Sequence, residues 1–490
     1  MHGRFEAVDD AHYKTFEWIF ESDGGEDYES NESDKINEDS DSDEGDDLRR
    51  SSSELFKHWL SLGRDIFHIS GKLGSGKSTL MKFLCEHDRT RGGLQQWAST
   101  FTYAIGPDGR YKCDRKLVFA SFFFWKPGTL LQKSLSGLYR SLLHDVLNSC
   151  PELIPMLLLD QWNEAKSMPW QVQTQLQLGT KDIKAAFTRL RENQNLYEKH
   201  CFCYFIDGLD EYEETRSEDY TEIVKILSDW TKKSRGNVKL CVSSREYNVF
   251  LNAFSSERRI RLQDLTRRDM ERYVREKLQI DKREDSETLI QAIVDKGDGI
   301  FLWVALVVKT LRDRLEASHE LLVLKSELDS LPDELEGLFT HLLRSLDKSA
   351  RKRTYQLFAV ITEGNPCATG YLSPLACSFL ENYYENKAFA MVPDFPYYIT
   401  EAAARNERAV LAYKSINGYC RGLLEFKRNN PGDETPCLTF IHRSIPEFLS
   451  TTNIEDDMNL LRILSLWKRF LSSCLLKYGQ RLPAAFREEK

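Results

Sequence analysis

GKLGSGKST, residues 71–79, is the stretch that decides the fold of this chain. It directly follows the apolar segment 65–70 (DIFHIS) and leads into a second apolar run, residues 80–84 (LMKFL). Its three glycines allow the backbone to curl, so that successive N–H groups face phosphate oxygens at the start of a helix. The spacing therefore predicts a P-loop between a strand and a helix.

The side chains of this loop predict a bound nucleotide with a magnesium ion. Lys77 is expected to reach the β- and γ-phosphates, and Ser78 offers a hydroxyl to Mg²⁺. The residues expected to contact the nucleotide are Gly71, Gly74, Ser75, Gly76, Lys77, Ser78 and Thr79. A Gly/Ser-rich surface turn is the alternative, which the flanking strand and helix patterns disfavour.

A cluster of carboxylates ends the apolar segment 201–206 (CFCYFI). Asp207 at the strand tip is expected to orient Mg²⁺ or its waters. Either Asp210 or Glu211 is expected to polarise the attacking water as a general base. The pattern is typical of a Walker B strand, and a solvated acidic turn is the alternative.

A third apolar segment, residues 238–244 (VKLCVSS), delivers Arg245 to the same edge of the predicted sheet. Ligands bind at the carboxyl edge of open α/β sheets, so Arg245 is a candidate γ-phosphate sensor. A surface arginine is the alternative.

Strand-like and helix-like patterns alternate along this region, which predicts an α/β P-loop NTPase with a parallel sheet and helices on both faces. Residues 117–125 (LVFASFFFW) read as a buried strand, and residues 99–116 as a surface hairpin or loop. Thr129 and Gln132 form a capping-box pattern that predicts the start of the next helix.

The charge of the chain is concentrated near its N-terminus. The net charge is −9, whereas residues 21–50 alone carry 14 acidic and three basic side chains, a net −11, which leaves the rest near +2. Residues 21–55 are therefore predicted to be a disordered acidic linker. The aromatic segment within residues 1–20 is expected to pack on the domain that follows.

Eleven cysteines are present without a CxxC pair, which disfavours both zinc and disulfide frameworks and predicts buried, reduced thiols. The longest apolar run, residues 300–308, is too short to cross a bilayer. The N-terminus matches no signal or transit peptide. The expected location is the cytoplasm, with no membrane partner.

The second half of the chain has a helical pattern that begins at a Thr266/Asp269 capping box. Residues 423–426 and 437–442 flank a turn signal at residues 430–433 and predict a hairpin. The sequence predicts six segments: residues 1–20, aromatic segment; 21–55, linker; 56–262, NTPase core; 263–346, helical lid; 347–450, winged-helix-like domain; 451–490, C-terminal helical segment.

Taken together, these motifs resemble the fungal NACHT proteins of the signal-transducing STAND class of NTPases, including nephrocystin-3-like modules. The matching stretches are residues 12–20, GKLGSGKSTLMKFL from Gly71, ASFFFW from Ala120, FIDGLDEY from Phe205, SSRE from Ser243, LQDLTRRDMERYV from Leu262, GIFLWVALV from Gly299, LPDELEGLF from Leu331 and FIHRSIPEFL from Phe440. They span nearly the whole chain. The chain departs from related plant and animal proteins at residues 299–301 (GIF), where those proteins carry Gly-x-Pro.

The resemblance implies a switch that binds ATP or ADP with Mg²⁺ and hydrolyses ATP slowly. It implies a homo-oligomer in the ATP state, an effector-domain partner and a part in non-self recognition or cell death. It also implies that His442 of the winged helix reaches the diphosphate of ADP and latches the closed state, with a half-exposed wing histidine as the alternative. No effector domain and no 30–45-residue repeat is visible, so a partial gene product is expected.

Two other functions compete with the switch. A DNA-binding winged helix would need a basic face, but the chain outside the acidic segment is near +2 and shows no stripe of Lys and Arg, so no nucleic-acid partner is expected. A metabolic kinase would need a short lid, whereas about 240 residues follow Arg245.

Overall fold

The computed structural model describes two compact units. One comprises residues 1–273 and 298–301, and the other comprises residues 274–297 and 302–490. The described residues are 3–12, 14–21, 40–99, 102–106, 109–112, 115–169, 177–216, 218–279, 284–315, 321–363, 372–379, 382, 385–386, 402–428 and 436–451.

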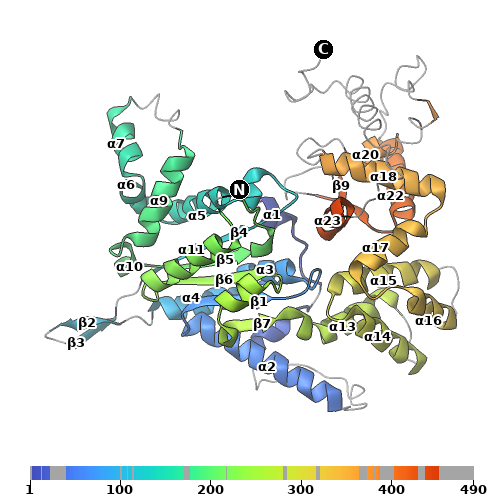
Figure 1. Ribbon diagram of the computed structural model, residues 1–490, viewed down its shortest axis with the longest axis horizontal. Helices are drawn as coiled ribbons and strands as arrows, with labels where there is room; N and C mark the ends of the chain where they lie inside the picture. The colour runs from blue at the N-terminus through green and yellow to red at the C-terminus, as the bar shows by residue number, and fades with distance from the viewer. Residues whose placement is uncertain are drawn as a thin grey trace. The chain divides into compact units, whose positions relative to one another are not determined.

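The first unit is built on a five-stranded parallel sheet with the order β4-β5-β6-β1-β7 (Figure 1). The strands are β1 (Asp65–Ser70), β4 (Lys116–Phe123), β5 (His200–Asp207), β6 (Val238–Ser244) and β7 (Arg259–Arg261). Ser70 of β1 is in register with Ser244 of β6, and Ile206 of β5 with Val242 of β6. The carboxyl ends of the three central strands therefore finish at the same edge.

Helices cover both faces of this sheet. Side chains of a strand alternate between its faces, and in β5 one face carries Phe202, Tyr204 and Ile206 while the other carries Cys201, Cys203 and Phe205. The first set shares a core with α5 (Leu135–Ser149), α9 (Thr180–Glu192) and α11 (Tyr220–Lys233). The second shares a core with α2 (Ser40–Ser61), α3 (Lys77–Glu86) and α4 (Asp88–Ser99). Burial on both sides explains the uninterrupted apolar sequence, and it confirms the predicted α/β class.

Shorter elements complete the first unit. The strands β2 (Thr102–Gly106) and β3 (Gly109–Lys112) pair antiparallel, which confirms the predicted hairpin. The others are α1 (Gly3–Ala7), η1 (Glu17–Phe20), η2 (Leu130–Lys133), η3 (Pro151–Leu153), α6 (Ile154–Leu157), α7 (Leu159–Ser167), α10 (Leu196–Lys199), η4 (Leu209–Glu211), α12 (Asn248–Ala253), η5 (Ser256–Arg258) and η6 (Leu262–Asp264).

The predicted disordered linker over residues 21–55 is wrong in its C-terminal part. Residues 40–55 belong to α2, while residues 22–39 lie outside the described chain. The helix forms because Phe56, Trp59 and Leu60 recur at helical spacing and are buried. The prediction was wrong because the first turns of α2 are acidic and polar, and its buried apolar residues come only later in the helix.

The start of α5 also differs from the prediction. The Thr129/Gln132 capping box is present, but it caps the short 3₁₀ turn η2. The helix itself begins at Leu135, where the Ser134 side chain accepts a hydrogen bond from the Gly137 N–H. Ser134 is therefore the N-cap residue of α5, whereas Thr129 caps only the short turn that precedes it.

The aromatic segment packs on the first unit, as predicted. Phe16, Trp18 and Phe20 are buried, and Phe16 and Phe20 lie 6.2 and 6.3 Å from the ring of Phe83 on α3. The Ser53 hydroxyl of α2 donates to the Ile19 carbonyl. Burying these rings contributes about 2 kcal/mol each, which holds the segment against the P-loop helix.

The second unit is mostly helical. The helix α13 (Arg267–Leu278) begins in the first unit and its residues from Val274 onward belong to the second. The remaining elements are α14 (Glu284–Gly297), α15 (Phe301–Leu315), α16 (Leu321–Ser330), α17 (Leu335–Arg344), α18 (Lys348–Glu363), α20 (Pro374–Cys377), α22 (Ala402–Cys420), β8 (Leu424–Lys427), β9 (Cys437–Phe440) and α23 (Ser444–Thr451).

The predicted hairpin of the second unit is present as the antiparallel pair β8 and β9. Its turn at residues 430–433 lies outside the described residues, as does the predicted C-terminal segment beyond residue 451. The domain boundaries and the winged helix stay predictions. In the described part of the chain, no helix is long and apolar enough to cross a membrane.

The cysteines that the structure describes are free and buried, in keeping with the predicted reduced thiols. Burial raises the pKa of Cys201 to about 11 and the pKa of Cys203 further. Thiols with raised pKa values are poor nucleophiles, so the two cysteines of β5 act as small apolar side chains.

A buried lysine joins α2 to the sheet. Lys239 of β6 is fully buried, and its Nζ donates to the carbonyls of Trp59 (2.5 Å) and Leu60 (2.9 Å) at the end of α2. The same Nζ lies 4.4 Å from the ring centre of Trp97. Burial is the main reason that the pKa of Lys239 is lowered to about 7.

Lys239→Met should change how stability depends on pH. Between pH 7 and about 10 the unfolded chain binds a proton at Lys239 that the folded chain lacks, so this lysine makes the free energy of unfolding rise with pH, by at most about 1.4 kcal/mol per pH unit. Urea unfolding at pH 7, 8 and 9 should show a shallower rise for the variant. The half-exposed Lys233→Met is the control, and a Lys239→Met curve parallel to wild type would contradict the prediction.

Candidate nucleotide-binding site

The P-loop lies between β1 and α3, where the sequence predicts it. Gly74 (φ 77°) and Gly76 (φ 94°) adopt left-handed backbone conformations, and Gly76 is the N-cap of α3. A Cβ at Gly71 would lie 2.8 Å from Ser75 Oγ and 2.9 Å from Gln263 Oε1. Glycine is therefore needed for conformation at 74 and 76 and for space at 71.

Lys77 is held inside this loop. Its side chain is buried, and its Nζ donates to the carbonyls of Gly71 (2.8 Å) and Lys72 (2.7 Å). Ser78 and Thr79, half-buried, follow it in the first turn of α3. A cation and the N–H groups of a helix N-terminus thus share one small volume, which is the electrostatic requirement for binding a polyphosphate.

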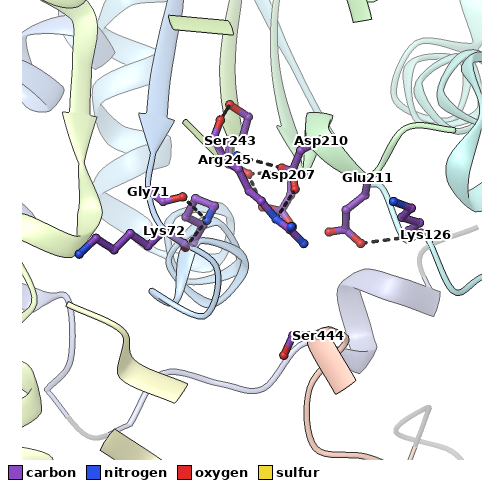
Figure 2. A network of polar contacts seen from close by, with 12 residues as sticks. Gly71, Lys72, Lys126, Asp207, Asp210, Glu211, Ser243, Arg245 and Ser444 are labelled. Atoms are coloured by element: carbon purple, nitrogen blue, oxygen red, sulfur yellow. Dashed lines mark hydrogen bonds and ion pairs between the residues drawn. The ribbon is translucent and has the colours of Figure 1, made fainter. Parts of the chain in front are cut away.

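Asp207 ends β5 at the same edge of the sheet (Figure 2). It is 1% exposed, and its Oδ1 accepts a hydrogen bond from the Ser243 hydroxyl. Ser243 Oγ in turn accepts the Gly208 N–H at 2.8 Å. The other oxygen, Oδ2, is buried without a hydrogen-bond partner among the described residues. A buried carboxylate oxygen of this kind suits a hard cation such as Mg²⁺.

Asp210 and Arg245 form an ion pair in the same network (Figure 2). Asp210 Oδ1 accepts the Arg245 backbone N–H at 3.0 Å, and its Oδ2 lies 3.0 Å from Arg245 Nε. Asp210 is buried and Arg245 is 17% exposed. The structure therefore brings together two predicted site residues, and Asp210 fixes the direction of the arginine.

Glu211 lies beside this pair in η4. It is 2% exposed, and its Oε2 accepts the backbone N–H of Lys126 at 3.2 Å. Lys126 follows the end of β4, so Glu211 links the carboxyl ends of two neighbouring strands. The sequence offered Asp210 and Glu211 as equal candidates for the general base. In the structure, Asp210 contacts Arg245 and Glu211 contacts the backbone of Lys126, so the two carboxylates are not equivalent.

A polar group that the sequence did not reveal supports the loop from η6. Gln263 Oε1 accepts the Lys72 backbone N–H at 3.2 Å, and its Nε2 donates to Glu246 Oε2 at 3.1 Å. The Arg261 side chain is hydrogen-bonded to Glu246 and is the main cause of a lowered Glu246 pKa. The one available signal was that Glu246 directly follows Arg245.

A second missed contact involves residues 298–299. The Lys72 ammonium pairs with the Asp298 carboxylate and also donates to the Asp298 carbonyl at 3.1 Å. Asp298 (φ 43°) and Gly299 (φ 76°) are both left-handed. A Cβ at Gly299 would lie 2.5 Å from the backbone oxygen of Gln263, so this turn packs tightly against the support of the P-loop.

His68 anchors β1 beneath the loop. Its Nδ1 accepts a hydrogen bond from Arg259 Nε at 3.0 Å, and its Nε2 lies 2.9 Å from Ser244 Oγ. Burial, followed by the positive charges of Arg259 and Lys77, lowers the pKa of His68 to about 3. The imidazole is therefore neutral at physiological pH and connects β7, β1 and β6.

The aromatic segment lies close to the P-loop and to α13. Phe16 Cζ would lie 3.5 Å from a Cβ at Gly76. The Trp18 indole donates to Asp269 Oδ2 at 3.2 Å, and Arg49 pairs with the same carboxylate at 2.9 Å. Burial raises the pKa of Asp269 despite the neighbouring arginines.

His442 belongs to the second unit and follows β9. Its Nδ1 lies 2.8 Å from Ser444 Oγ and accepts the Ser444 N–H at 3.1 Å. Its predicted contact with a diphosphate stays a prediction.

With this geometry in hand, comparison with known families gives two matches. Residues 50–245 match the N-terminal domain of nephrocystin 3, and residues 345–461 match a domain of unknown function, DUF7791. The first match includes the C-terminal half of α2, the P-loop, the carboxylate cluster and Arg245. The fold is that of a P-loop NTPase. No curated protein matches the chain significantly.

Solved structures give distant matches. The Drosophila origin recognition complex bound to DNA is 12% identical with a TM-score of 0.34, covering 84% of this chain and 86% of that one. The ORC2 protein of Aeropyrum pernix with ADPNP and ADP is 14% identical with a TM-score of 0.30, covering 89% and 94%. A Walker-type ATPase of Pyrococcus abyssi is 14% identical with a TM-score of 0.31, covering 81% and 94%. These values are too low to transfer any property to this chain.

Arg245→Met should destabilise the first unit. Removing one partner of a buried ion pair costs about 3 kcal/mol. Urea unfolding should show this loss, and the double variant with Asp210→Asn should recover part of it. Arg258→Met, which breaks the partly exposed pair with Asp65, is the matched control and should cost less than about 1 kcal/mol. Equal losses for Arg245→Met and Arg258→Met would contradict a buried pair.

Proposed function

We propose that this protein is a nucleotide-operated switch of the NACHT type, which binds ATP or ADP with Mg²⁺ and hydrolyses ATP slowly. One observation carries the proposal. The Lys77 ammonium is held within the P-loop, and the Oδ2 atom of Asp207 is buried without a partner at the same sheet edge. A site with both features suits a phosphate chain together with a divalent cation.

Ser78 and Asp207 would hold the magnesium ion, which when bound neutralises charge on the phosphates. The P-loop N–H groups and Lys77 would orient the β- and γ-phosphates. The Ser243 hydroxyl holds Asp207 through Oδ1, which would leave Oδ2 available to the cation. Asp207 is positioned by the end of β5, and Lys77 and Ser78 are positioned by the first turn of α3, so fixed elements of the fold favour precise placement.

Glu211 is the better candidate for the residue that polarises the attacking water. Asp210 has Arg245 N–H and Nε at 3.0 Å, and a carboxylate beside a guanidinium is a weak base. Asp210 would instead act as a positioning residue that directs Arg245 toward the γ-phosphate. The roles that the sequence left open are thereby divided between the two carboxylates.

Slow hydrolysis suits a switch because the output depends on which conformation is populated. In this proposal ADP favours a closed form in which His442 contacts the diphosphate, and ATP favours a homo-oligomer that signals to an effector-domain partner. The match to the N-terminal domain of nephrocystin 3 and the helical second unit support a regulatory rather than a metabolic role. Participation in non-self recognition or cell death belongs to the same proposal.

Lys77→Ala should abolish nucleotide binding while leaving the fold intact. Protein purified without added nucleotide is denatured, and the released nucleotide is identified and counted. Wild type should release ADP, and Lys77→Ala should release none, with an affinity for added ADP at least about 100-fold weaker. Lys72→Ala is the matched control, because the Lys72 ammonium pairs with Asp298 rather than with the loop interior.

Unchanged ADP affinity in a folded Lys77→Ala variant would refute the site. His442→Ala tests the latch separately. Retention of ADP in this variant at wild-type affinity would remove His442 from the proposal and leave the P-loop site in place.

Glu211→Gln should preserve ADP and ATP affinity and slow single-turnover ATP hydrolysis about 100-fold or more, since general-base catalysis contributes about that much. The isosteric amide keeps the acceptor that the Lys126 N–H needs. Hydrolysis at the wild-type rate would exclude Glu211 as the base.

A further inference from the structure

Three side chains that commonly ligate metals meet at the amino ends of β4 and β5, the sheet edge opposite the P-loop. Lys116 and His200 are in register there as the first residues of these strands. Cys150 is the C-cap of α5, and Glu152 lies in η3. The Cys150 Sγ, a Glu152 carboxylate oxygen and a His200 ring nitrogen all lie within 4.8 Å of one another. No other group of three such side chains occurs in the described ranges of the chain.

We propose that Cys150, Glu152 and His200 form a binding site for a zinc-like divalent cation, with a fourth position open to water. Thiolate, imidazole and carboxylate are the ligands that Zn²⁺ prefers. The Nε2 atom of His200 lies 3.5 Å from Glu152 Oε1. Zinc–ligand bonds of about 2.0–2.1 Å in a tetrahedron place two such atoms about 3.3 Å apart. Two of the three ligands therefore already have nearly the required spacing.

The histidine is oriented for this role. Its Nδ1 lies 3.1 Å from the Leu196 carbonyl, so Nδ1 carries the proton and Nε2 presents a lone pair to the cluster. The ring is buried at the start of β5 and stacks near Phe202, with 6.2 Å between ring centres. A backbone carbonyl that fixes the tautomer of a ligating histidine is the usual support of a zinc ligand.

The cluster already attracts a positive charge. The Lys116 ammonium donates to the Ser149 carbonyl at 2.7 Å and to Glu152 Oε1 at 3.2 Å. These two contacts place the ammonium between the last carbonyl of α5 and the Glu152 carboxylate. Lys116 thus occupies the position of a cation among these groups.

A metal ion can replace this ammonium. The Lys116 side chain is 48% exposed and can turn into water, and Glu152, 53% exposed, opens the cluster to solvent. Zinc binds cysteine as the thiolate, so metal binding would release the proton of the Cys150 thiol. The sequence gives no hint of the site, because Glu152 and His200 are 48 residues apart and no CxxC spacing is present.

In the first experiment, the full chain is treated with a chelator and then titrated with Co²⁺. Binding is monitored by the charge-transfer absorption between a thiolate and cobalt. We expect this absorption to saturate at one equivalent and to disappear when Zn²⁺ is added. Cys150→Ser and His200→Gln should lose it. Cys201→Ala is the matched control, because this variant removes a buried thiol next to His200 in β5. The Cys201→Ala variant should retain the absorption. No charge-transfer absorption in wild type at one equivalent, or an unchanged one in Cys150→Ser, would overturn the proposal.

Two exposed positions keep the test independent of folding. Glu152→Gln should weaken Zn²⁺ binding more than about tenfold, and Lys116→Gln should strengthen it, because the competing ammonium is gone. Unchanged affinity in both variants would refute a site at this cluster. Lys77→Ala should bind Co²⁺ as wild type does, so that failure of the metal site and failure of the nucleotide site can be told apart.

Discussion

The register of three parallel strands is the constraint on which the nucleotide site depends. Pairing of Ser70 with Ser244 and of Ile206 with Val242 makes β1, β6 and β5 end together. The loop after β1 and the carboxylate that ends β5 then face the same space without any long side chain having to reach across. A shift of one residue in β5 would turn Asp207 to the other face of the sheet. The core that fixes the register is therefore also what fixes the chemistry.

Buried ionisable side chains connect the elements around this sheet. Lys239 joins β6 to the end of α2, and Asp269 joins α13 to both Trp18 and Arg49. Each is costly to bury alone and is satisfied by groups distant in sequence. The aromatic segment and α2 are thus held to the P-loop domain by specific polar contacts as well as by apolar burial, which explains why an acidic, polar stretch is followed by a well-packed helix.

The sequence predicts well those features that local residues determine. The P-loop, the carboxylate cluster after β5 and the buried strands follow from glycine spacing, strand ends and apolar runs, and each lies where expected. The sequence could not show that Ser243 supports Asp207, that Gln263 supports Lys72 or that Asp298 pairs with it, because these partners are 36, 191 and 226 residues apart. Separation in sequence also hides the cluster of Cys150, Glu152 and His200, because Glu152 and His200 are 48 residues apart. The prediction of an acidic linker was wrong for a local reason, because the average composition of residues 21–55 concealed the start of α2 and its buried face.

The turn at residues 298–299 has a mechanical consequence. It packs with the first unit, yet the chain on both sides of it, α14 and nearly all of α15, belongs to the second. Lys72 of the P-loop contacts this turn through the carboxylate and the carbonyl of Asp298, and both residues of the turn have left-handed backbone conformations. A ligand that moved Lys72 would therefore act directly on this turn, and because linkage is reciprocal a change in the turn would act back on Lys72 and on the loop to which it belongs.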